Sequence, residues 1–198
     1  MAQRDRFDGQ FEAVLGAARL GTPWAFERIF TTLAPVVAGY LRVQGSTEPD
    51  DLTSEVFLGV LRNLDSFEGD EAHFRSWVFT IAHRRLLDER RRVSRRPPAE
   101  PLAEAPDLLG PDDVEATVDR SLATERVYAL CERLAPDQRD VLLLRLVAQL
   151  TIEEVAETLG KTSGAVKALQ RRGFRAVGRL LEREGVSLCG SPTITKPT

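Results

Sequence analysis

A proline-rich acidic stretch divides this sequence into two halves and limits the folds open to it. Residues 95–113 read RRPPAEPLAEAPDLLGPDD, with five prolines, several acidic residues and no apolar periodicity. Proline has no amide donor and disfavours helical geometry in the residue before it, so a helix cannot run through this stretch. Compositions of this kind form linkers. We therefore predict a flexible proline-rich linker over residues 94–115, between two separate domains.

Both halves have the pattern of helices. Apolar residues recur at spacings of three and four, and alternating β-branched runs are almost absent. The pattern predicts helices over residues 7–20, 24–41, 50–64 and 71–92, and then over 118–134, 137–147, 151–159 and 163–183. Thr22 before Pro23 and Thr47 before Pro49 are candidate N-caps. The predicted fold is all-α, with two small helical domains over residues 1–93 and 116–184 and a flexible tail over 185–198.

Composition excludes several classes of protein. Two cysteines in 198 residues cannot form a disulfide framework. No apolar stretch approaches the roughly 20 residues of a membrane span, and the N-terminus opens with charges, so we expect a cytoplasmic protein without stable membrane insertion. His73 and His83 have no partners at metal-ligand spacing, and no phosphate-binding glycine loop is present. We expect no catalytic residues, metal or cofactor, and therefore no enzyme.

Basic residues are concentrated in two stretches, although the net charge is −3. Residues 161–183 hold seven basic side chains and the single acid Glu182, and residues 84–96 hold seven arginines against Asp88 and Glu89. Two separate basic stretches on an acidic chain indicate two contacts with a polyanion.

Residues 150–181 have the spacing of a helix-turn-helix. Thr151 and Glu154 form a capping box at the start of the first helix, and Gly160 suits the left-handed end of that helix. A second helix then restarts at Thr162 or Ser163. The alternative reading is a helical hairpin whose basic face is only solvated.

The second helix of this motif is predicted to bind DNA. Val166 and Leu169 point to the core, which leaves the basic residues outside. We predict base contacts in the major groove by Lys167, Arg171 and Arg172, and phosphate contacts by Lys161, Ser163 and Arg175.

The two halves together resemble a known family. Residues 50–92 resemble region two of bacterial RNA polymerase sigma factors, in the extracytoplasmic-function (ECF) group of the sigma-70 family, and residues 134–181 are similar to region four. The pattern of region four alone is also found in response-regulator DNA-binding domains. Both regions in this order are specific to sigma factors. The resemblance implies a dissociable subunit that binds core RNA polymerase, recognises −35 and −10 promoter DNA, both double-stranded and melted, and promotes melting.

The resemblance also implies site residues. The helix over residues 50–64 is implied to dock on the clamp helices of the polymerase's largest subunit through Asp50, Asp51, Leu52, Glu55, Val56 and Phe57. The −10 element is implied to contact Phe67, Glu68, Gly69, Asp70, Trp77, His83, Arg84 and Arg85. The family often has asparagine where His83 stands, and a polar or basic residue where Ala168 and Leu169 stand. An anti-sigma factor is a further implied partner, since many relatives are held inactive by one.

Two other functions remain open at this point. A stand-alone transcriptional regulator would use its N-terminal bundle to sense a ligand or to dimerise, and it would bind an operator without polymerase. A helical adaptor would show no salt-dependent affinity for DNA.

Overall fold

The computed structural model describes residues 7–95 and 126–183, and every regular element within them is helical. The all-α prediction is therefore confirmed. Residues 96–115 of the predicted linker and residues 185–198 of the predicted tail lie outside the described residues. Within the described ranges, no helix has the length and apolar composition that crossing a membrane requires.

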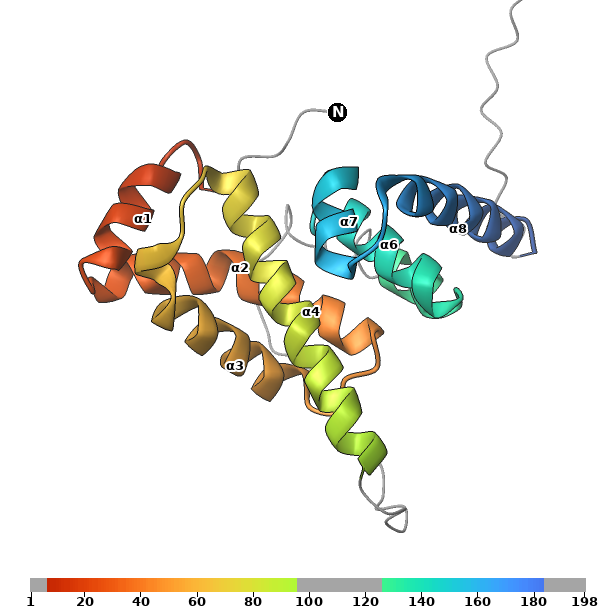
Figure 1. The fold of residues 1–198 in the computed structure, drawn as a ribbon, viewed down its shortest axis with the longest axis horizontal. Helices are drawn as coiled ribbons and strands as arrows, with labels where there is room; N and C mark the ends of the chain where they lie inside the picture. The colour runs from red at the N-terminus through yellow and green to blue at the C-terminus, as the bar shows by residue number, and fades with distance from the viewer. Residues whose placement is uncertain (1–6, 96–125, 184–198) are drawn as a thin grey trace, which may run out of the picture.

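The N-terminal helices form a bundle (Figure 1). Its core is rich in aromatic rings. They are α1 (Phe11–Arg19), α2 (Pro23–Val43), α3 (Pro49–Arg62) and α4 (Glu71–Arg95), with a short 3₁₀ helix at Leu64–Ser66. Edge-to-face and tilted contacts join Phe7 to Phe11, Phe11 to Phe74 and Phe74 to Phe67, with ring centroids 5.1–5.4 Å apart.

Two predicted helix starts differ from the structure. The first helix begins at Phe11 and not at Phe7, because Asp8 and Gly9 take positive φ angles of 53° and 75°. The predicted Thr47 cap is wrong, because Glu48 is the N-cap of α3 while the amide and hydroxyl of Thr47 donate to Glu89 Oε1 at 3.2 and 3.0 Å.

Thr22 does occupy the N-cap position of α2, with Pro23 following it as predicted. Its hydroxyl, however, donates back to the carbonyl of Ala17 and does not accept from the first turn of α2. The side chain therefore fixes the turn between α1 and α2.

The C-terminal helices are the helical segment 126–132, α6 (Pro136–Leu146), α7 (Ile152–Leu159) and α8 (Ser163–Arg183). The capping box is confirmed: Thr151 Oγ1 accepts from the Glu154 amide at 3.2 Å, and Glu154 Oε2 accepts from the Thr151 amide at 2.6 Å. Gly160 ends α7 with a φ of +60°, as predicted. The helix-turn-helix is therefore present.

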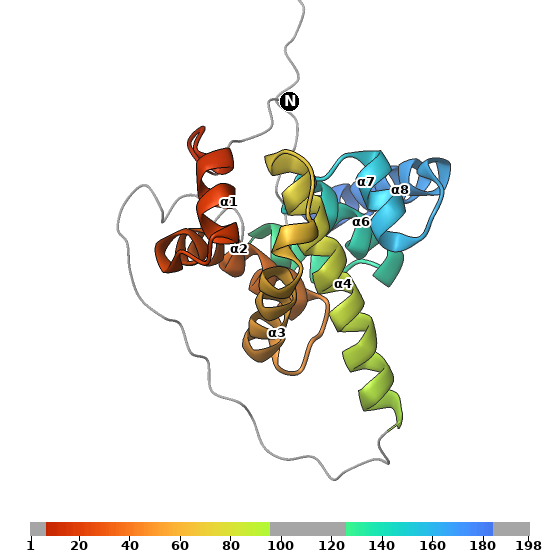
Figure 2. The ribbon, with the colours of Figure 1, turned by 60° about the vertical axis from the view of Figure 1, so that its left-hand side comes forward.

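The C-terminal helices pack directly on the N-terminal bundle. Helix α7 lies beside the first half of α4, and α6 lies behind it in both views (Figures 1 and 2). The second half of α4 projects away from this contact. On α2, the ring of Tyr128 from segment 126–132 lies over Gly39, where a Cβ would displace it.

Candidate nucleic-acid and protein interfaces

The outer face of α8 carries an exposed basic row. Val166 and Leu169 are buried, and Leu142 of α6 fits so closely against Gly173 that a Cβ there would lie 2.9 Å from its Cδ1. This packing sets the opposite face of α8 outward. Lys167, Arg171 and Arg175 lie one turn apart along that face and are all exposed.

Phe174 belongs to the same surface, and the sequence prediction missed it. Its ring is 45% exposed, and it lines a shallow open depression together with Lys167, Gln170, Arg171 and Arg175. Its spacing from Gln170 and Arg171 is the signal that could have found it, since residues three and four apart share a helix face.

The other three predicted residues for the −35 element lie apart from this row. Arg172 is exposed but turns back along the helix, with its Nε 3.4 Å from the Ala168 carbonyl. Ser163 begins α8, whose first turn is capped by Thr162 Oγ1 accepting from the Ala165 amide at 3.2 Å. Lys161 pairs with Asp137 Oδ1 at 3.3 Å.

The six residues predicted for polymerase binding divide between the surface and the core. Leu52, Val56 and Phe57 are at most 4% exposed, so they pack α3 onto the bundle. Asp50 and Asp51 are exposed, and Glu55 is half-buried. The structure therefore leaves only the acidic members of this set on the surface.

Two leucines that the prediction did not include complete the outer face of α3. Leu58 is 50% exposed and Leu61 is 45% exposed. Asp51, Glu55 and Leu58 follow the spacing of one helix face, so the surface of α3 is acidic near its start and apolar near its end.

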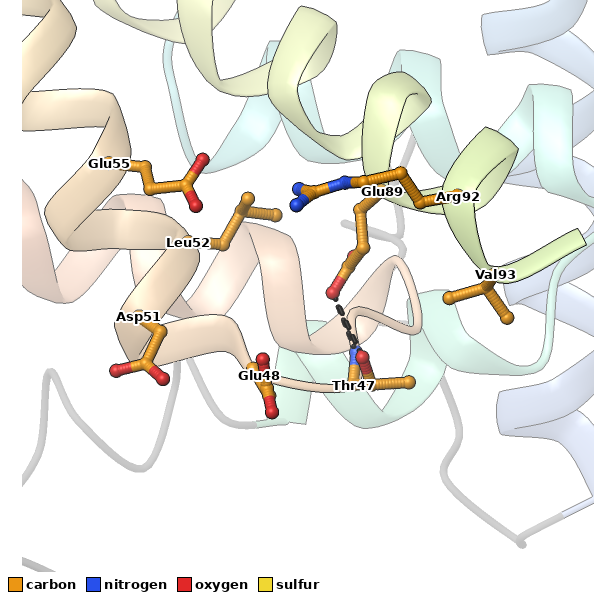
Figure 3. Close-up of a pocket in the computed structure, with 8 residues that line it drawn as sticks. All are labelled: Thr47, Glu48, Asp51, Leu52, Glu55, Glu89, Arg92 and Val93. Carbon is orange, nitrogen blue, oxygen red and sulfur yellow. Dashed lines mark hydrogen bonds between the residues drawn. The ribbon is translucent and has the colours of Figure 1, made fainter. Parts of the chain in front are cut away.

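A small hollow lies beside the acidic end of α3. It has a volume of about 120 Å³ and is lined by Thr47, Glu48, Asp51, Leu52 and Glu55 and, from α4, by Glu89, Arg92 and Val93 (Figure 3). Glu89 is buried and accepts from Ser46, from the Thr47 amide and from the Thr47 hydroxyl at 2.9–3.2 Å, so it fixes the loop before α3. Arg92 extends from α4 toward Leu52 and Glu55 of α3 (Figure 3).

The loop before α4 has an aromatic floor and a polar rim. Phe67 is buried, with its ring centroid 5.2 Å from that of Trp77. Glu68, Gly69 and Asp70 are exposed. Gly69 has a φ of +138°, and a Cβ there would lie 2.7 Å from the Cβ of His73, so only glycine fits this turn.

Asp70 has a structural role that the prediction missed. Its Oδ1 accepts from the His73 amide at 2.9 Å and lies 2.7 Å from His73 Nδ1. These hydrogen bonds hold the pKa of the Asp70 carboxyl below its usual value. An aspartate directly before a helix is the N-cap signal that could have predicted this role.

The remaining predicted residues for the −10 element lie along α4. Trp77 is half-buried, and Arg84 is exposed. Arg85 is half-buried, with its Nη2 beside Gly59 of α3. His83 is only 7% exposed, and its Nδ1 lies 2.9 Å from the Tyr40 hydroxyl. The structure thus brings Phe67 and Trp77 together and separates His83 from the surface.

Among the described residues, no three His, Cys, Asp or Glu side chains gather in a group that could hold a metal ion.

Comparisons with known proteins identify the family of this chain. Residues 29–96 match the family model for sigma-70 region 2, and residues 124–177 match that for sigma-70 region 4. The ECF RNA polymerase sigma factor BldN of Streptomyces coelicolor is 33% identical over 170 residues, or 83% of this chain and 63% of BldN, so the chain spans less than two thirds of BldN. SigD of Mycobacterium tuberculosis, also an ECF sigma factor, is 30% identical over 175 residues, or 84% of this chain and 81% of SigD.

Two solved structures share the fold. CnrH in complex with the cytosolic domain of CnrY superposes with a TM-score of 0.59 at 22% identity, covering 88% of this chain and 98% of that one. The sigma factor RpoE in complex with the anti-sigma factor NepR, from Bartonella quintana, gives a TM-score of 0.57 at 20% identity, covering 79% and 96%. The chain therefore belongs to the ECF group of the sigma-70 family and is a sigma subunit that directs transcription initiation.

Proposed function

We propose that this sigma subunit binds core RNA polymerase through α3, contacts the −10 element through α4 and the loop before it, and contacts the −35 element through α8. The observation that carries this proposal is the presence of both sigma regions in order, each with an exposed charged surface. The subunit acts by binding alone and performs no covalent chemistry. It works in the cytoplasm, where promoter DNA and the polymerase are.

Recognition of the −35 element is assigned to the row Lys167, Arg171 and Arg175. A helix in the major groove can present such side chains to guanine edges and to phosphates. The exposed ring of Phe174 supports a thymine contact at the same surface, because the thymine methyl is the apolar group of that groove. Arg172 and the α8 start at Ser163 serve the flanking phosphates.

Melting of the −10 element is assigned to the loop before α4. A base that leaves the duplex needs a stacking surface and nearby hydrogen-bonding groups. Trp77 over Phe67 offers the first, and Glu68 with the exposed turn at Gly69 offers the second. Arg84 adds positive charge for the backbone of the separated strand.

Binding to core polymerase is assigned to the outer face of α3. Asp51 and Glu55 favour a basic partner surface, and Leu58 and Leu61 favour an apolar one. An anti-sigma factor is a second proposed partner, because the RpoE that shares this fold was solved with the anti-sigma factor NepR.

The test is transcription with sigma-free core polymerase and the purified full chain on a set of promoters. We expect promoter-specific transcripts that appear only when the chain is added. Tight binding of free duplex without any transcript would overturn the proposal in favour of a stand-alone regulator. No salt-dependent DNA affinity, with or without polymerase, would favour an adaptor.

A further inference from the structure

Arg19, the last residue of α1, holds the turn that leads into the loop before α4. Its Nε donates to the Leu64 carbonyl at 3.4 Å, and its Nη2 donates to the Phe67 carbonyl. Leu64 begins the 3₁₀ helix and Phe67 follows its end, where the Phe67 amide donates to the Leu64 carbonyl at 3.2 Å. One guanidinium therefore contacts both ends of this turn.

Arginine suits this double contact better than lysine. Its guanidinium is planar and charged, and it presents several N–H donors in a fixed arrangement. Two carbonyls can accept from it at the same time, and hydrogen bonds from a charged donor are stronger than those between neutral groups. A lysine ammonium on its flexible stem would not fix the positions of the two carbonyls relative to each other.

The helix that carries Arg19 is itself fixed at both ends. After its last residue, the amide and the hydroxyl of Thr22 both donate to the Ala17 carbonyl and close the turn into α2. At its first residue, the ring centroid of Phe11 lies 5.4 Å from that of Phe74 on α4. Arg19 therefore projects from a rigid element, as the precise positioning of a loop requires.

The hydrogen bond to the Phe67 carbonyl sets where the polar rim of the loop begins. A peptide bond is planar, so the carbonyl oxygen of Phe67 and the amide of Glu68 lie in one plane. Holding that oxygen fixes the plane from which Glu68 continues, beside the rings of Phe67 and Trp77 with centroids 5.2 Å apart. At the other end of the loop, Asp70 accepts from the His73 amide at 2.9 Å. The rim is thus held from α1 on one side and from α4 on the other.

We propose that Arg19 is a positioning residue for promoter melting, which holds the loop before α4 in the shape that receives an unpaired base. The inference rests on the proposed function of this loop. It adds to that function a residue of α1, which lies before the residues 29–96 that match sigma-70 region 2. A loop that is already ordered loses less conformational freedom when the base binds, so strand separation becomes less costly.

The rate of open-complex formation by the Arg19→Met chain tests this role. Methionine keeps an unbranched side chain and removes both donors, and Arg19 is exposed, so the core stays intact, which circular dichroism verifies. On a duplex promoter that the wild-type chain transcribes, permanganate reactivity of unpaired thymines should appear about tenfold more slowly, the loss expected for one charge-assisted hydrogen bond that acts in this step. Binding of core polymerase and of the closed promoter should not change. The same promoter with a pre-opened bubble should be transcribed at close to the wild-type rate.

Two further variants separate positioning from charge and from folding. Arg28→Met is the matched control, because Arg28 is also exposed but its Nη2 donates to Asp8 Oδ2 at 3.0 Å, next to the other end of α1. It should melt the duplex at the wild-type rate. Arg19→Lys keeps the positive charge and should stay about threefold or more slower than wild type. A full rate for Arg19→Lys would overturn the proposal, because charge near the DNA would then be sufficient. No loss for Arg19→Met on the duplex, or equal losses on duplex and bubble, would also overturn it.

A double variant shows whether Arg19 acts through the loop. Groups that work as one unit are not additive, so the Arg19→Met/Glu68→Ala chain should lose less than the product of the two single losses on the duplex. A loss equal to that product would overturn the positioning role. A loss for Glu68→Ala that the bubble restores, without one for Arg19→Met, would overturn the role of Arg19 alone. No such loss for either variant would instead overturn the melting function proposed for the loop.

Discussion

The hydroxyl of Tyr40 lies 2.9 Å from Nδ1 of His83, inside the contact between the N-terminal and C-terminal helices. Burial lowers the pKa of His83, while the nearby Asp140 carboxylate acts in the opposite sense. Burial also raises the pKa of Asp140, so both groups favour their neutral forms. A histidine that the family resemblance assigns to DNA is thus part of the packing between the N-terminal and C-terminal helices.

The pH dependence of folding stability follows from His83. The pKa of His83 in the folded chain lies below the unfolded value of about 6.5. The neutral imidazole therefore contributes to folding stability above that pH, and this stability is lost as the pH falls below it. Asp140 acts in the opposite sense, because a folded pKa raised by burial makes its contribution to folding stability grow as the pH falls. We expect denaturant midpoints to fall between pH 7.5 and 5.5, and to fall less in His83→Gln. An equal fall in both chains would exclude His83 as the cause.

Binding of core polymerase should depend on the exposed residues of α3. Asp51→Arg combined with Leu58→Ala reverses one charge and removes one exposed apolar side chain, and it should reduce co-purification with core polymerase at least tenfold at unchanged helicity. Leu146→Ala, at a partly exposed leucine of α6, is the control. Phe57→Ala is unsuitable, because loss of its buried ring would cost about 3–5 kcal/mol of folding stability. Normal polymerase binding by the α3 variant would mean that core polymerase binds another surface of the chain.

Local signals in the sequence predicted much of the fold. The capping box at Thr151, the left-handed Gly160 and the outward basic residues of α8 all depend on neighbours within one or two turns, and the structure has each of them. The burial of Phe57 and the exposure of Leu58 could not be predicted in the same way. Phe57 and Leu58 are both apolar and adjacent on α3, so the sequence alone does not indicate which of them is buried. The packing of α2 and α4 against α3 decides it.

The burial of His83 could not be predicted from its neighbours in the sequence either. It depends on Tyr40, which is 43 residues away in the sequence, and on α6 beyond the linker. The candidate site was thus predictable where one helix forms it, and not where distant segments meet.

Substitutions on α8 should separate base contacts from phosphate contacts. Arg171→Ala should cost about 1–3 kcal/mol at particular −35 positions, as expected for a bidentate guanine contact. Arg175→Ala and Arg172→Ala should weaken all promoters more evenly and lower the salt dependence of binding. A library of −35 variants, transcribed with each chain, measures the pattern. The same uniform loss for all three variants would remove the assignment of Arg171 to a base.

Asp70 should act as a helix cap before any contact with DNA. Asp70→Ala should lower the free energy of unfolding by roughly 0.5–2 kcal/mol, whereas Asp70→Asn should lower it by much less, because asparagine also caps well. Thermal unfolding of both variants checks this. If Asp70→Asn folds normally but initiates poorly on duplex promoters, then the charge of Asp70 acts in initiation as well as in capping.

Melting should depend on the polar rim of the loop before α4. Strand separation costs pairing and stacking energy, so a group that holds an unpaired base helps only while the bubble has to be opened. Glu68 is exposed beside the ring pair of Phe67 and Trp77, so Glu68→Ala should slow initiation on a duplex promoter without changing folding or polymerase binding. A template with a pre-opened bubble should restore most of the lost rate. Asp65→Ala, at an exposed acid of the 3₁₀ helix outside the loop, should initiate normally on both templates. If the bubble restores nothing while polymerase binding is normal, Glu68 acts at another step and the melting assignment of this loop is wrong.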